Sequence, residues 1–206
     1  AGAAGAAGGG VGDGEAPSVS VSDSGPDGAW HDVRDGSGRV TGRVKARVGY
    51  DPDGAYVLSQ GGAPREHRGV VRVDPVCASD LVRAVGGDAG ARGTCLRVRV
   101  GGAEVSSSVV GGDATAPVWD GESLELPVSG LRDVDAVAEV SVVDAGGHEV
   151  GSVHVPLSSL LARGTAAVVA ASGGDVPASV RSAAAAGAAG AAGAAGGGVG
   201  DGEAPS

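Results

Sequence analysis

The side chains that most often carry catalysis or bind metals are sparse in this chain. Only two cysteines occur among its 206 residues, Cys77 and Cys95, together with four histidines: His31, His67, His148 and His154. None of them shows the close pairing of ligands that is typical of zinc sites. The serines Ser106–Ser108 have no neighbouring base that would activate a hydroxyl nucleophile. These patterns predict no catalytic group, no metal site and no cofactor, so we do not expect an enzyme.

Basic residues form a more regular pattern. In three segments they alternate with apolar residues, which places the two kinds on opposite faces of a strand. The outward set contains six of the fifteen basic residues: Arg43, Lys45, Arg47, Arg72, Arg97 and Arg99. Such a face would suit an acidic partner, either a protein surface or an acidic lipid. The alternative is an ordinary solvent-exposed strand face, whose charges only prevent unwanted pairing with other strands.

Composition predicts the elements that must position these residues. Phe and Met are absent, so the core must be built from Val, Leu and Ala, with four aromatic residues: Trp30, Tyr50, Tyr56 and Trp119. Val-rich alternation favours strands. We expect one short helical turn, at 156–162, and strands in the following segments: from Trp30 to a strand that ends at Tyr50, then 69–81, a strand through 96–100 within the loop and strand segment 85–102, then 104–110, 124–128, 137–143, 150–155 and 166–171.

Charge and cysteine content limit the possible partners. The formal net charge is −10, which argues against nucleic acid as the main partner. No run of about 18 apolar residues is present, so the sequence predicts no membrane-spanning helix. Two sparse cysteines suit free thiols in a reducing compartment, although a bridge between neighbouring strands is the alternative. This favours an intracellular location.

An exact repeat indicates the domain organisation. Residues 1–18, AGAAGAAGGGVGDGEAPS, recur letter for letter at 189–206, which is 188 residues later. We interpret the chain as one period of a longer tandem array; a duplicated cloning segment is the alternative. Residues 1–29 and 172–206 would be Ala/Gly-rich linkers around a folded unit at 30–171. For residues 183–198 we favour a flexible linker over an extended or frayed helix.

Two segments of the folded unit resemble a C2 domain. The segment AWHDVRDGSGRVTGRVKARVGY is similar to its closing motif, and DAGGHEVGSVHVPL is similar to part of its second half. The resemblance implies an all-β fold: an eight-stranded antiparallel β-sandwich, in which the six basic residues lie on neighbouring strands. Here the strand that ends at Tyr50 precedes the strand that begins near Gly69. Either these two strands form a local hairpin, as in a circular permutant, or one is donated to the next unit; we favour the hairpin.

The resemblance also implies a test for calcium. C2 domains that bind calcium use several Asp side chains from two loops, because the ion needs six to eight oxygen ligands. Asp88 and Asp144 match the first position of each loop, but the next positions fall on Gly93 and Gly146. We therefore expect these two residues to be vestigial turn residues, and no calcium binding.

Two functions follow as hypotheses. The first is a structural repeat unit of a tandem C2-domain array, which assembles into a fibre, filament or scaffold through contacts with neighbouring units. The second is a peripheral membrane module that recognises acidic lipid through the basic face.

Overall fold

The structure is a computed structural model. It describes residues 16–25, 27–82, 93–113, 115–119, 121–133 and 136–191. Within these ranges no helix combines the length and the apolar character that crossing a bilayer requires.

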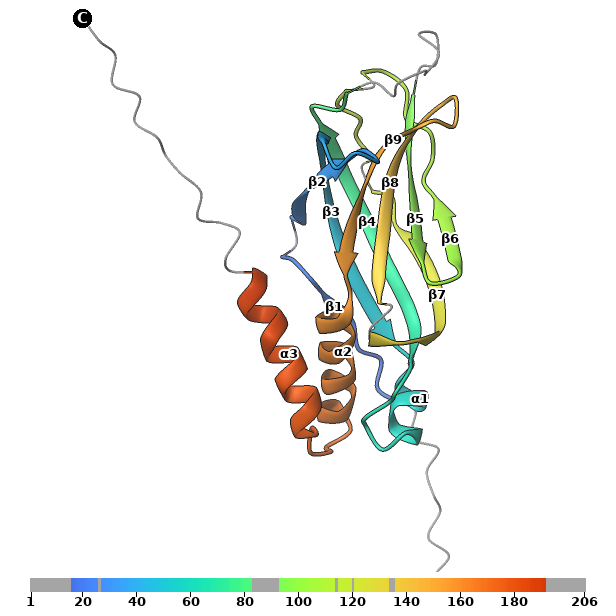
Figure 1. Cartoon of the computed structure of the whole chain (residues 1–206). Coiled ribbons are helices and arrows are strands. Elements are labelled where there is room, and N and C mark those ends of the chain that lie inside the picture. The colour runs from blue at the N-terminus through green and yellow to red at the C-terminus, as the bar shows by residue number, and fades with distance from the viewer. Residues whose placement is uncertain are drawn as a thin grey trace, which may run out of the picture.

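β-Strand is the main secondary structure of the described residues, as the sequence predicts. Eight strands form one antiparallel, nearly closed sheet in the order β6-β5-β8-β9-β2-β3-β4-β7, and the short β1 adds to β3 (Figure 1). Their bounds are β1 Val21–Ser22, β2 Ala29–Arg34, β3 Val40–Pro52, β4 His67–Ser79, β5 Thr94–Val100, β6 Ala103–Ser106, β7 Leu124–Leu131, β8 Val137–Asp144 and β9 Glu149–Pro156. The all-β class is thus confirmed. The strand expected at 104–110 is shorter, because after Ser106 the chain returns to the sheet only where Val110 bridges Thr94.

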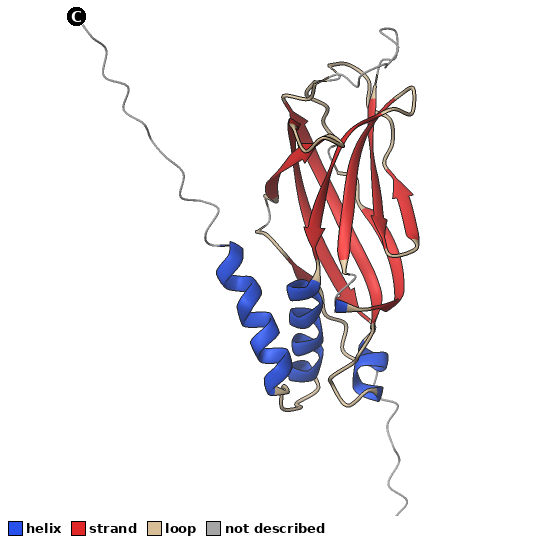
Figure 2. Cartoon of the chain, viewed as in Figure 1, coloured by secondary structure: helices blue, strands red, loops and turns tan. Residues whose placement is uncertain are grey.

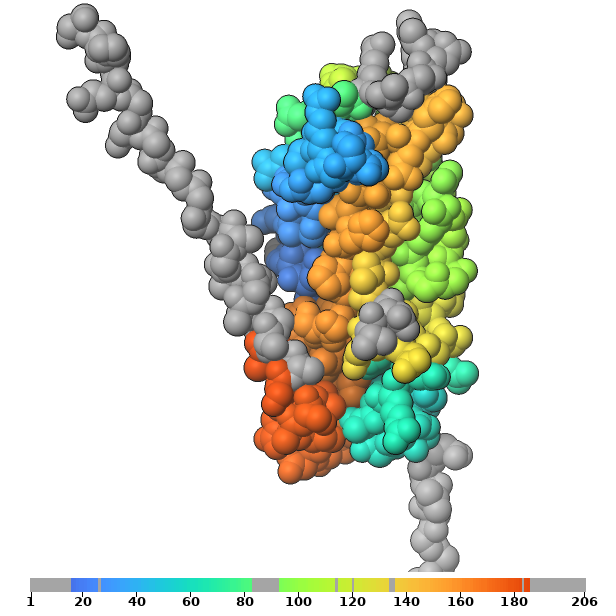
Figure 3. Space-filling view, in the orientation of Figure 1, coloured from blue at the N-terminus to red at the C-terminus, as the bar shows by residue number. Residues whose placement is uncertain are grey.

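The sheet consists of two four-stranded halves that meet at one residue pair. Strands β6-β5-β8-β9 form one half and β2-β3-β4-β7 the other, and the only register pair between β2 and β9 is Arg34 with Ser152. A glycine allows this close crossing, since a Cβ on Gly151 would lie 2.7 Å from the Arg34 carbonyl oxygen. In Figure 3 the β2–β3 hairpin, light blue, lies directly against the orange surface of β9.

Strands β3 and β4 form the longest pairing, from Arg43 opposite Ser79 to Pro52 opposite Gly69. Both strands belong to the same chain, which agrees with the local hairpin that we favoured over strand donation. The connection contains helix α1, Gly54–Ser59, whose first turn is capped by Asp53 accepting a hydrogen bond from the Tyr56 N–H.

The alternating pattern identified the core correctly. All nine residues expected to face inward on β3, β4 and β5 are buried: Val44, Ala46, Val48, Tyr50, Val71, Val73, Leu96, Val98 and Val100. Trp30 is a correction, because this aromatic residue was counted toward the core and is 42% exposed.

Helices replace two predicted features. Residues 158–171 form one helix, α2 (Ser158–Ala171), where we expected a single turn and then a strand. A strand would not place Leu160, Leu161, Gly164, Thr165 and Val168 on one side, whereas a helix buries all five. Helix α3, Ala178–Ala191, lies in a segment assigned to the linker. Figure 2 shows both helices and α1 gathered at one end of the sheet, with loops at the other.

The residues before the sheet also dock at this helical end. Val19 packs against the cluster of Val57, Val168 and Val169, and Pro17 presents its carbonyl oxygen to Gly54, 2.8 Å from where a Cβ would stand. Pro17 and Val19, which the sequence assigned to a linker, therefore pack against the folded unit.

Candidate functional site

The six basic residues do not share one face. Arg43, Lys45 and Arg47 lie on β3 and Arg72 on the adjacent β4, but Arg97 and Arg99 lie on β5. Strand β5 belongs to the other half of the sheet and is separated from β3 by β8, β9 and β2. The prediction of three neighbouring strands is therefore wrong for β5, because the chain places this strand beside β8.

Acidic neighbours neutralise most of these cations. Arg47 binds Asp74, with Nε 2.9 Å from Oδ2, and Asp74 also accepts a hydrogen bond from Ser123. Arg72 lies between Asp51 and Glu125, at 2.8 and 3.1 Å. These residues form a cross-strand ion-pair network on β3, β4 and β7 and leave little unbalanced charge there.

The two arginines of β5 share one carboxylate. Glu104, on the adjacent β6, lies 2.5 Å from Arg99 Nε and 3.8 Å from Arg97 Nε. This hydrogen bond to Glu104 is the main reason why the pKa of the exposed Arg99 is raised. Both arginines therefore have an acidic partner on the neighbouring strand.

One patch keeps its positive charge. Trp30 on β2 stands directly opposite Lys45 on β3, and the Arg43 guanidinium lies 5.5 Å from the centre of the Trp30 ring. The nearest carboxylate is Asp32, 3.6 Å from both Arg43 and Arg34. Among the described residues Lys45 has no ion-pair partner. We call the outward side chains of Trp30, Arg43 and Lys45 the Trp30 patch.

Trp30 was missed as a surface residue although the sequence contained the signal. Val33 is fully buried on β2, so the two-residue period directs His31 inward and Trp30, Asp32 and Arg34 outward. An exposed Trp beside two cations is unusual in a chain with four aromatic residues, and such residues often dominate binding interfaces.

Of the two proposed vestigial calcium residues, the structure describes only Asp144. Asp144 closes its own turn, since Oδ1 accepts hydrogen bonds from the backbone N–H groups of Gly146 and His148. Partial burial opposes ionisation, but these donors and the nearby His148 ring outweigh it and lower the pKa of Asp144. Asp88 lies outside the described residues. Among the residues that are described, no three His, Cys, Asp or Glu side chains are grouped to hold a metal ion.

The cysteines are free thiols. Cys77 and Cys95 are both half-buried, and their strands β4 and β5 are not neighbours in the sheet. Burial raises the pKa of the Cys95 thiol above its ordinary value, which disfavours the reactive thiolate. The serine run is structural as well: Ser107 Oγ accepts the Leu96 N–H, and Ser108 binds Glu122 through its N–H and hydroxyl.

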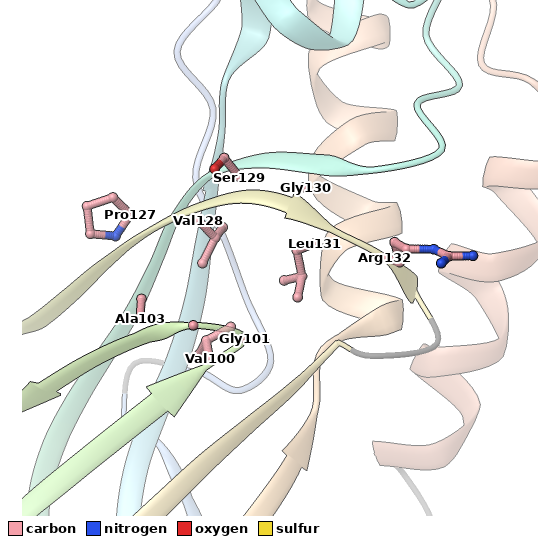
Figure 4. Close-up of a pocket in the computed structure, with 10 residues that line it drawn as sticks. Val100, Gly101, Ala103, Pro127, Val128, Ser129, Gly130, Leu131 and Arg132 are labelled. Atoms are coloured by element: carbon pink, nitrogen blue, oxygen red, sulfur yellow. The ribbon is translucent and has the colours of Figure 1, made fainter.

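A shallow pocket of about 460 Å³ marks the gap where the sheet does not close. Figure 4 shows the β5–β6 turn, with Val100, Gly101 and Ala103, facing Pro127, Val128 and Leu131 of β7, while Arg132 points away. Most of these side chains are apolar or small, and Pro127 provides no N–H for strand pairing. The pocket has no converging polar groups that would orient a ligand.

Comparison with known proteins adds no family. No family model matches the chain, and no curated protein is detectably similar to it in sequence.

Proposed function

We propose that this chain is one structural unit of a tandem array, in which C2-like β-sandwiches assemble into a fibre, filament or scaffold through contacts between neighbouring units. The observation that carries the proposal is the exact 18-residue repeat at an interval of 188 residues. The division of the sheet into two four-stranded halves supports the C2-like architecture.

The positions of the two copies of the 18-residue repeat in the structure support a short connection of the same length between all successive units. The second copy begins inside α3, because Ala189–Ala191 complete that helix. The last three residues of the first copy, Ala16–Ser18, lie at the docked start of the unit. If the identical residues 204–206 start the next unit, only residues 192–203 separate the two bodies.

This connection is short compared with the unit itself. An extended chain from Ala191 to Ala204 reaches at most roughly 45 Å. The 13 residues of β3 alone measure about 43 Å. Successive units would therefore lie within one body length of each other, which favours regular contacts over independent tumbling.

A protein of two consecutive repeats tests the proposal. We expect crosslinks between the two bodies and a single, narrow distribution of their separation in small-angle scattering or electron microscopy. A broad distribution with no crosslinks would contradict assembly through unit contacts, and so would a gene in which residues 19–188 do not recur beyond Ser206.

Acidic-lipid binding is the second proposal, and the exposed Trp30 beside Arg43 and Lys45 favours it. It predicts co-sedimentation with phosphatidylserine vesicles that weakens with salt and with Lys45→Glu. The matched control is Arg99→Glu, on the other half of the sheet. Equal recovery with neutral vesicles would contradict lipid recognition.

A further inference from the structure

The Trp30 patch offers two cations and an aromatic ring, with only one carboxylate beside them among the described residues. Asp32 is the nearest carboxylate, at 3.6 Å from Arg43, and it also faces Arg34. Together with Arg34 and Asp32, the patch therefore contains three cations and one anion. An acidic partner would be recognised here by charge and by contact with the Trp30 ring.

The chain itself carries such a partner twice. The repeated segment contains Gly-Asp-Gly-Glu at residues 12–15 and again at 200–203. Its glycines have no side chains that would hold the backbone away from a flat strand surface, and its two carboxylates lie two residues apart. That spacing matches Arg43 and Lys45, which are also two residues apart on one strand face.

The first copy cannot reach the patch. Pro17 is fixed beside Gly54, beyond the end of β3, and Lys45 lies seven residues up that strand, about 23 Å away. Asp13 is only four residues from Pro17, a reach of roughly 14 Å.

The second copy has the necessary length. Helix α3 ends at Ala191 on the same side of the molecule as β2 (Figure 1). Helix α2 packs Gly164 against Tyr50, so the helical end of the body meets β3 only five residues from Lys45, about 17 Å along the strand. Asp201 lies ten residues beyond Ala191 and reaches up to about 35 Å.

We propose that the Trp30 patch binds the acidic segment Gly200–Glu203 of the same chain. Arg43 and Lys45 pair with Asp201 and Glu203, and the backbone of the segment covers the Trp30 ring. Together with the proposed function, on which this last step rests, the contact holds the connection between two units against the sheet of the preceding unit and fixes their spacing.

Tryptophan fluorescence of the full 206-residue chain tests the contact. Trp30 is 42% exposed and Trp119 only 2%, so acrylamide quenching reports mainly on Trp30. We expect Asp201→Asn with Glu203→Gln, and separately Lys45→Glu, to increase the quenching constant about twofold. High salt should produce the same increase, because the pairs are at the surface. The matched control, Asp13→Asn with Glu15→Gln, removes the same charges from the same sequence and should change nothing.

Other outcomes would overturn the proposal. Equal effects of the two double variants, or no effect of either, would show that the second copy does not occupy the patch. If Trp30 is protected from acrylamide quenching only at high protein concentration, the segment that covers it belongs to a second molecule. If phosphatidylserine vesicles protect Trp30 from quenching and neither double variant changes the quenching, the patch binds lipid and not the acidic segment. The assay uses a single unit, so its result is independent of whether units assemble.

Discussion

The packing of α2 against the sheet depends on Gly164. A Cβ at this position would lie 2.7 Å from Cδ1 and 3.1 Å from Cε1 of Tyr50, well inside the usual carbon–carbon contact of about 3.5–4.0 Å. Tyr50 has little freedom to move away, because it is fully buried and its hydroxyl donates a hydrogen bond to the Arg68 carbonyl oxygen at 2.8 Å.

Two opposing terms determine the effect of Gly164→Ala. Alanine is favoured over glycine inside a helix by about 1 kcal/mol. Overpacking a rigid core typically costs 1–3 kcal/mol, so roughly 2 kcal/mol at this site. We therefore expect a net loss of about 1 kcal/mol in the free energy of unfolding, or roughly 2–4 °C in Tm for a chain of this size.

Urea and thermal denaturation followed by circular dichroism measure this loss. The matched control is Ala167→Gly in the same helix, which reports the propensity term. In a Tyr50→Val background the steric term is removed, so Gly164→Ala should become stabilising by about 1 kcal/mol. A stabilising Gly164→Ala in the wild-type background would refute the contact between α2 and β3.

Three further predictions concern single side chains. Burial is the main cause that lowers the pKa of His31, so the unfolded chain binds a proton more readily than the folded one. The free energy of unfolding should therefore fall as pH drops below about 6.5. Denaturation at several pH values should show a weaker dependence of stability on pH for His31→Gln. The pKa of Asp144 is lowered in the folded protein. Its contribution to the free energy of unfolding is therefore present above the unfolded pKa of about 4 and is lost as pH falls through the folded pKa. Asp144→Asn should weaken this loss of stability in acid, and an unchanged dependence of stability on acidic pH would contradict the assignment. Glu104→Gln removes the acidic partner of both Arg97 and Arg99. Because Arg99 is exposed and Arg97 partly exposed, we expect little change in the free energy of unfolding in urea denaturation, and a large loss would indicate an unrecognised role.

Strand positions were predictable because alternation is a local signal. Val44 to Tyr50 and Leu96 to Val100 required only the two-residue period. Chain order alone left both a local hairpin and strand donation open for β3 and β4, which pair within this chain. The helix at 158–171 was missed because Ala-Ala-Val-Val is short and apolar, and its periodicity does not separate strand from helix. Contact with Tyr50 through Gly164 favours the helix, and this contact is not local in sequence.

For the candidate site, the sequence predicted the direction of the side chains but not which strands lie together. The outward direction of Arg43, Lys45 and Arg97 was correct, because direction depends on neighbours in the sequence. Their grouping was wrong, because grouping depends on which strands become neighbours, and here β5 pairs with β6 and β8. Partners such as Asp74 for Arg47, 27 residues away, then decide which cations remain available.

The Trp30 patch is set apart by position as well as by charge. On β4 and β5 every basic residue of the predicted set has an acidic neighbour on the next strand: Glu125 stands opposite Arg72, and Glu104 stands opposite Arg99 and lies 3.8 Å from Arg97. On β3 the residues opposite Lys45 are Trp30 on one side and Cys77 on the other, and neither carries a compensating charge. If strand-face charge served only to prevent edge pairing, β3 would have little need of it, since β3 is paired with β2 on one side and β4 on the other. An unbalanced cation on an interior strand, beside an exposed Trp, is therefore better explained by a partner than by protection of an edge.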